Sequence, residues 1–82
     1  MLHLGEEIVI PFNKIIAILD VKTLSLSEIN TEFFQTAQDE GFIRKISDKV
    51  KSYIITTDND IYLSPISSVT LKARFEKGYK VL

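Results

Sequence analysis

The chain has 82 residues, of which 45% are hydrophobic and 26% are charged, and its formal net charge is −1. This length predicts a single domain, residues 1–82. Its core is small, so self-association is a further way to bury apolar surface. The lack of cysteine excludes disulfides and cysteine-based zinc sites, and no apolar run reaches the roughly 20 residues of a transmembrane helix.

The N-terminal third of the chain predicts short strands. Residues 1–7 lack the basic region of a secretory signal, so we expect a cytoplasmic protein without membrane attachment. Two apolar runs, residues 2–4 and 8–10, flank an acidic turn and predict a hairpin or a bulged strand. Residues 14–20 form the most hydrophobic segment, which is short and β-branched. This segment predicts the central strand of a sheet, covered on both faces.

The middle of the chain predicts a helix and then a hairpin. Ile29, Phe33 and Ala37 recur every four residues and predict a helix over residues 28–40, with Gly41 at its end. Residues 42–46 and 52–57 are both strand-like, and we expect them to pair as a hairpin whose tip is the polar, basic segment 47–51.

The last third predicts a turn, a strand and a second helix. Asn59 suits a positive φ in the turn before the strand at residues 61–63. Pro65 ends that strand because proline has no amide proton for the ladder. Ser67 or Ser68 is the expected N-cap of a helix from about residue 69 to 77, with Gly78 closing it.

The predicted order is strand, strand, helix, strand, strand, strand, helix. Hairpin connections with a single intervening helix favour antiparallel pairing over a doubly wound arrangement. The sequence therefore predicts an α+β fold, a small and mostly antiparallel five-stranded sheet with two helices in one layered domain.

The sequence contains few candidates for catalytic residues. The only histidine is His3, and a lone histidine is more often a packed or surface residue than a ligand. The acidic pairs at residues 6–7 and 58–60 are more typical of solvated turns than of a metal site. Ser64, Ser67 and Ser68 lie beside a proline and at a helix start, where structural roles are available. We expect no enzyme, no metal site and no cofactor.

Charge is distributed unevenly along the chain. Residues 1–41 are acidic, whereas residues 42–52 and 72–80 are each basic. The first basic run holds Arg44, Lys45, Lys49 and Lys51 against Asp48. A phosphate backbone can use such a local patch despite a slightly acidic chain, but the residues alone slightly favour a solvated surface.

A longer motif carries a resemblance. The run Tyr62-Leu63-Ser64-Pro65-Ile66-Ser67-Ser68, then Thr70-Leu71-Lys72 and Arg74, together with Leu2-His3-Leu4-Gly5, resembles the RemA/RemB-like family of small bacterial regulators of biofilm-matrix genes. The resemblance covers nearly the whole chain and is strongest to the RemB-like members.

The resemblance implies a DNA contact surface on a ring-shaped homo-oligomer. In RemA-like members the contacts are a basic residue at the start of the second long strand and an arginine pair in the basic hairpin. By spacing, the first falls on Lys14 and the pair falls on Asp48 and Lys49, with Lys51 close by. Asp48 departs from the pattern and repels phosphate, and lysine lacks the bidentate fork of arginine.

Two hypotheses of function follow. The first is a transcription regulator of extracellular matrix genes, a homo-oligomer that contacts DNA phosphates through Lys14, Lys49 and Lys51, with Arg44 and Lys45 in support. The alternative is a protein-interaction module that acts through a partner such as a RemA-like regulator without binding DNA itself.

Overall fold

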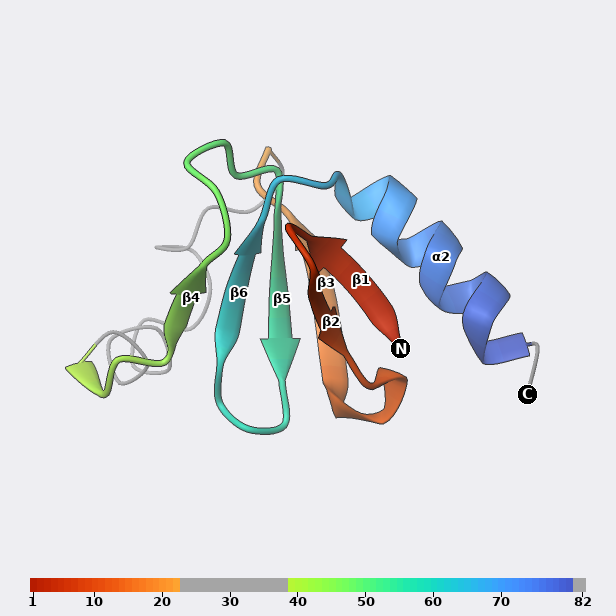
Figure 1. Ribbon diagram of the computed structural model, residues 1–82, viewed down its shortest axis with the longest axis horizontal. Coiled ribbons are helices and arrows are strands. Elements are labelled where there is room, and N and C mark those ends of the chain that lie inside the picture. The colour runs from red at the N-terminus through yellow and green to blue at the C-terminus, as the bar shows by residue number, and fades with distance from the viewer. Residues whose placement is uncertain (23–38, 81–82) are drawn as a thin grey trace.

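The computed structural model describes residues 1–22 and 39–80, and the elements below belong to those ranges (Figure 1). In chain order they are β1 (Leu2–Gly5), β2 (Ile8–Ile10), the 3-10 helix η1 (Phe12–Lys14), β3 (Ile15–Asp20), β4 (Ile43–Lys45), β5 (Ser52–Thr56), β6 (Ile61–Ser64) and α2 (Ser68–Lys80). They form a small α+β domain, as predicted. The helix predicted over residues 28–40 lies almost wholly outside the described residues.

The N-terminal strands form their own two-stranded antiparallel sheet, with Leu2 opposite Ile10 and His3 opposite Val9. The register shifts between His3 and Gly5, so the hairpin is also bulged. Both turn residues, Glu6 and Glu7, have positive φ angles of 44° and 69°. The sequence prediction of a hairpin or bulged strand is therefore confirmed.

The other four strands form a sheet in the order β3-β5-β6-β4. The β3–β5 and β5–β6 pairs are antiparallel, whereas β4 and β6 are parallel. The prediction of one five-stranded sheet is wrong, because the described residues contain six strands in two sheets. The predicted hairpin between residues 42–46 and 52–57 is also wrong, since β4 pairs with β6 instead of β5.

The segment between β4 and β5 explains this pairing. The Ile46 N–H donates to the Leu63 carbonyl at 3.1 Å, and the Lys51 N–H donates to the Ser64 carbonyl at 2.8 Å. The chain therefore passes the end of β6 and enters β5 on the other side of that strand. A tight hairpin has no room for such a crossing.

The central position belongs to β5 and not to β3. All five residues of β5 are buried, because strands flank it on both sides and apolar side chains pack on both of its faces. In the described sheet β3 is an edge strand, and the side chain of its residue Ile16 is 63% exposed. The prediction that residues 14–20 form the central strand is therefore wrong, because it relied on hydrophobicity alone.

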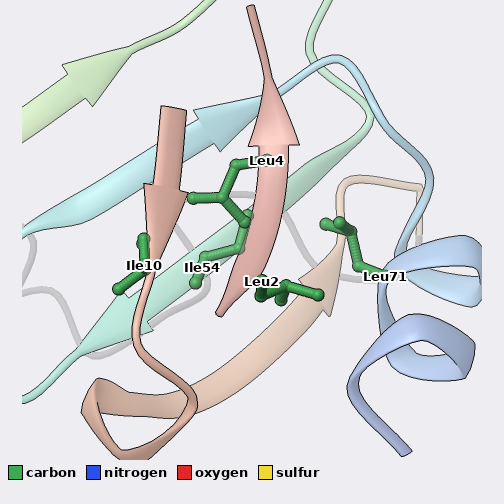
Figure 2. Close-up of a cluster of buried hydrophobic side chains, with 5 residues drawn as sticks. All are labelled: Leu2, Leu4, Ile10, Ile54 and Leu71. Carbon is green, nitrogen blue, oxygen red and sulfur yellow. The ribbon is translucent and has the colours of Figure 1, made fainter. Parts of the chain in front are cut away.

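The core consists of two clusters, one on each face of the sheet. Ile54 belongs to the first and its chain neighbours Tyr53 and Ile55 to the second, as strand alternation requires. Figure 2 shows the first cluster, in which β1, β2 and α2 bring their side chains to β5. Its buried members are Leu2, Leu4, Ile10, Ile54 and Leu71.

Two buried serines anchor the turn after β6. The Ser64 hydroxyl donates to the Leu4 carbonyl at 2.6 Å and accepts from the Ile66 N–H at 3.1 Å. The Ser52 hydroxyl donates to the Ile66 carbonyl at 2.7 Å. The turn is thus tied to β1 through Ser64 and to β5 through Ser52, and α2 leaves it in a set direction.

Ser67 is the N-cap of α2, because its hydroxyl accepts from the Thr70 N–H at 3.2 Å. Ser68 instead donates to Asp20 at 3.1 Å and ties the helix start to the end of β3. The helix continues to Lys80, so the prediction that Gly78 closes it is wrong. A Cβ at Gly78 would lie 2.4 Å from the Cζ atom of Phe12, so this glycine lets the ring approach the helix.

No helix within the described ranges combines the length and the apolar character needed to cross a bilayer.

Candidate nucleic-acid interface

Lys14 is the last residue of η1 and precedes β3. The Thr57 N–H donates to its carbonyl at 2.8 Å, which places Lys14 beside the turn between β5 and β6. Its Nζ lies 3.1 Å from Oδ2 of Asp58 in that turn, and both side chains are about half exposed. A phosphate therefore has to compete with a carboxylate for Lys14, although an exposed pair of this kind contributes little stability.

Arg44 and Lys45 lie on β4 and are exposed, and each has an acidic partner. The Arg44 Nε is 3.4 Å from Asp60, and the Lys45 Nζ is 3.0 Å from Asp48. Asp48 is 97% exposed, so its pair with Lys45 is held only weakly. The residue that departs from the basic pattern thus neutralises a neighbour on β4.

Lys49 and Lys51 lie in the segment that crosses from β4 to β5, and both are exposed. Their backbones are held, because the Lys49 N–H donates to the Ser47 hydroxyl and the Lys51 N–H donates to the Ser64 carbonyl. The ion pairs found among the described residues involve Lys14, Arg44 and Lys45, and not these two lysines. They are accessible cations on an anchored backbone.

Four of the five predicted contacts fall into two groups, and the fifth, Arg44, lies opposite Tyr62 on β6 and pairs with Asp60. Lys45, Lys49 and Lys51 gather where β6 ends and β5 begins. Lys14 lies at the other end of β5, because Ile15 pairs with Thr56 whereas Asp20 pairs with Ser52. At 3.3 to 3.4 Å per residue, this separates Lys14 from Lys51 by roughly 20 Å within one chain.

A groove of mixed charge runs beside the basic strand β4. Its volume is about 560 Å³, and it lies between the turn of the N-terminal hairpin and β4. The lining residues are Glu6, Glu7, Ile8, Val9, Arg44, Lys45, Ile46 and Tyr62. Carboxylates near Arg44 and Lys45 reduce the positive potential that this side of the molecule offers to DNA.

Two basic residues outside the predicted set line a separate pocket. Arg74 and Lys77 lie on α2 beside His3 and Phe12, away from β4. The sequence did show a signal for them, because the run 72–80 is basic and these two residues are spaced as neighbours on one helix face.

The three serines that are possible nucleophiles make structural hydrogen bonds. Ser64, Ser67 and Ser68 make the hydrogen bonds described above, which supports their structural interpretation. His3 is exposed on β1. Within residues 1–22 and 39–80, no three of His, Asp and Glu come together in a way that could hold a metal ion.

Comparisons with known proteins identify the family. The model of the RemA-like family, with the description extracellular matrix regulatory protein A-like, matches residues 1–75. Extracellular matrix regulatory protein B of Bacillus subtilis (strain 168) is 34% identical over 80 residues, covering 98% of this chain and 95% of the relative. The match is nearly full-length on both sides. This chain therefore belongs to the RemA-like family of extracellular matrix regulatory proteins.

Proposed function

We propose that this protein regulates the transcription of bacterial extracellular matrix, or biofilm, genes by binding the DNA backbone as a cytoplasmic homo-oligomer. Lys49 and Lys51 contact phosphates, Lys14 adds a contact at the far end of the sheet, and Arg44 and Lys45 support the surface. The observation that carries the proposal is the pair of accessible lysines on an anchored segment, in a chain of a regulator family.

Self-association raises the number of phosphate contacts that the protein can make with one duplex. A single domain presents the proposed cations in small groups at the two ends of β5, so each copy supplies few phosphate contacts. Repetition of the domain multiplies weak contacts by avidity. Exposed apolar side chains give each copy a surface to bury, and they are Met1, Ile8, Val9, Ile16 and Val69.

The experiment is a fluorescence-anisotropy titration of the protein on duplex DNA at several salt concentrations. We expect Lys49→Ala and Lys51→Ala each to weaken binding to all sequences and to flatten the dependence of log K on log salt by about 0.9 per lost phosphate contact. Lys14→Ala should have a smaller effect, because Asp58 already pairs with this lysine. Lys72→Ala, which removes the same charge from α2, is the matched control and should change little.

Direct DNA binding is refuted if wild-type protein gives no anisotropy change at about 50 mM salt, where non-specific electrostatic binding is strong. A loss for Lys72→Ala equal to that for Lys51→Ala would instead show that net charge matters and the proposed surface does not.

The groove beside β4 favours one alternative, a protein-interaction module that acts through a partner such as a RemA-like regulator. Acidic and basic residues face a partly apolar groove, an arrangement better suited to a protein surface than to a phosphate backbone. Under this alternative the Val9→Glu substitution abolishes capture of a purified RemA-like partner and leaves DNA titrations unchanged. Wild-type protein that fails to bind such a partner in a pull-down removes this alternative.

A further inference from the structure

A second basic site lies on the other side of the molecule from β4. An open pocket of about 590 Å³ is formed where the last turns of α2 meet β1 and η1. Its lining residues are Met1, Leu2, His3, Phe12, Arg74, Lys77 and Gly78. In Figure 1 the start of β1 lies beside α2, and β4 is at the opposite edge of the sheet.

The floor of this pocket is apolar and held in place. Leu2 is 1% exposed and belongs to the core. The Phe12 ring packs edge to face on Phe75, with ring centroids 5.4 Å apart, and reaches the helix where Gly78 has no side chain. The pocket is therefore built on the core and does not depend on a loose surface loop.

The two charged side chains that line the pocket, Arg74 and Lys77, are both basic. Arg74 and Lys77 are three residues apart on one face of α2, and the imidazole of His3 lines the same pocket. No carboxylate side chain is among the lining residues, and the ion pairs within the described ranges lie elsewhere. Glu76, the acidic residue of this part of the helix, is exposed and does not line the pocket.

We propose that this pocket binds a phosphate group. The guanidinium of Arg74 matches phosphate oxygens as a fork, and the ammonium of Lys77 adds a second charge. Two cations balance the charge of −1.5 to −2 on a phosphate monoester near neutral pH, and His3 supplies a further donor. Met1 and Phe12 offer an apolar surface to the organic part of the ligand.

The phosphate can come from a small phosphorylated compound or from a nucleic-acid backbone, and experiment separates these sources. The pocket does not depend on the function proposed above, because none of its residues belongs to the DNA surface around β4. Binding of phosphate can therefore be measured whether or not the protein binds DNA.

The test is an NMR titration of the folded protein with inorganic phosphate, observing the ring protons of His3 and the side-chain signals of Arg74. Saturable shifts are expected at both residues. The Arg74→Ala/Lys77→Ala variant should lose at least about tenfold in affinity, as expected for two charge-assisted contacts. Lys72→Ala is the control, since Lys72 lies on the same helix in a separate groove beside Ile16 and Phe75.

Shifts that stay linear with phosphate concentration, or an equal loss for Lys72→Ala, refute the site. Arg74→Lys should retain part of the phosphate affinity that Arg74→Ala loses, because lysine keeps the positive charge and a hydrogen-bond donor. A duplex DNA titration then assigns the source. If the double variant loses DNA affinity in parallel, the ligand is a phosphodiester, and if DNA affinity is unchanged, it is a small phosphorylated compound.

Discussion

At the scale of single residues, hydroxyl groups direct the fold at the turn after β6. Ser52 and Ser64 are both buried, and their hydroxyls donate to the backbone carbonyls of Ile66 and Leu4, respectively. Removing either hydroxyl loses a hydrogen bond of this kind, whose net contribution to stability is about 0.5 to 1.5 kcal/mol. Ser64 belongs to the motif that carries the family resemblance, and its contacts give it a structural role.

Ser67→Ala should lower the free energy of unfolding by about 1 kcal/mol, because the Thr70 N–H loses its capping acceptor. Urea denaturation followed by circular dichroism measures the change. Ser67→Asp keeps an acceptor at the cap and should retain most of the stability. Wild-type stability in Ser67→Ala would show that the cap contributes nothing, and lost DNA binding in such a stable variant would place Ser67 in a site.

Asp20 gives the stability a dependence on acid pH. The Lys22 N–H donates to its carboxylate at 2.7 Å and lowers the pKa of Asp20 below its ordinary value of 3.8, and Ser68 adds a smaller effect in the same direction. A lowered pKa in the folded state means that the stabilisation is present above the unfolded-state pKa. It is lost as pH falls through the folded-state pKa.

Asp20→Asn should therefore be less stable than wild type at pH 6, and the difference should shrink steadily as pH falls below about 4. Thermal denaturation of both proteins between those values measures the difference. A difference in melting temperature that stays constant down to the lowest pH would contradict the assignment, because an effect unrelated to the charge of Asp20 does not depend on pH.

At the scale of elements, the position of each strand is set by its partners. β4 is short and exposed on two of its three residues, so its side chains contribute little burial. Its place beside β6 comes from backbone pairing and from the Ile61 N–H, which donates to the Phe42 carbonyl at 2.9 Å. Because the basic residues Arg44 and Lys45 lie on this strand, the pairing decides which surface they occupy.

Gly78→Ala tests helix propensity against packing. Alanine is favoured over glycine inside a helix by about 1 kcal/mol, which predicts a more stable protein. Its Cβ would however lie 2.4 Å from the Phe12 ring, and overpacking of this kind costs about 1 to 3 kcal/mol. We expect a net loss in the free energy of unfolding, measured by urea denaturation.

The matched control is the same substitution in a Phe12→Ala background. With the ring removed, Gly78→Ala should stabilise the protein, as propensity alone predicts. If Gly78→Ala destabilises both backgrounds equally, the close approach of Phe12 is not the reason for the glycine.

At the scale of the whole molecule, the proposed DNA contacts divide between the two ends of a sheet. Lys14 lies at one end of β5, and Lys49 and Lys51 lie near the other. A single chain cannot bring these groups together without moving the strand between them. In the oligomer that we propose, repetition of the domain would place several copies of both groups along one duplex.

The prediction at this scale is a mass in solution several times the 9.4 kDa of one chain, measured by light scattering at micromolar concentration. Ile16→Lys should reduce that mass, because it places a charge on the exposed edge strand β3. Thr57→Lys, which places the same charge at another exposed position beside the β5–β6 turn, is the control. A wild-type mass of one chain would overturn the oligomer.

Local chemistry was enough to predict much of this protein from its sequence. The N-terminal hairpin, Asn59 at a φ of 70°, the break at Pro65 and the cap at residues 67–68 each depend on near neighbours in the chain. The predicted helix after the cap was right in its start and short at its end, because Gly78 is a good C-terminal signal by itself.

Pairing and position were decided only in three dimensions. The sequence could not show that β5 lies inside the sheet and β3 at its edge, because both are apolar and β-branched. It could not show the β4–β6 pair or the contact of Gly78 with Phe12, since these depend on segments far apart in the chain. The same holds for the site, where sequence indicated the basic runs and the fold separated Lys14 from Lys51 and set Arg74 and Lys77 around a pocket of their own.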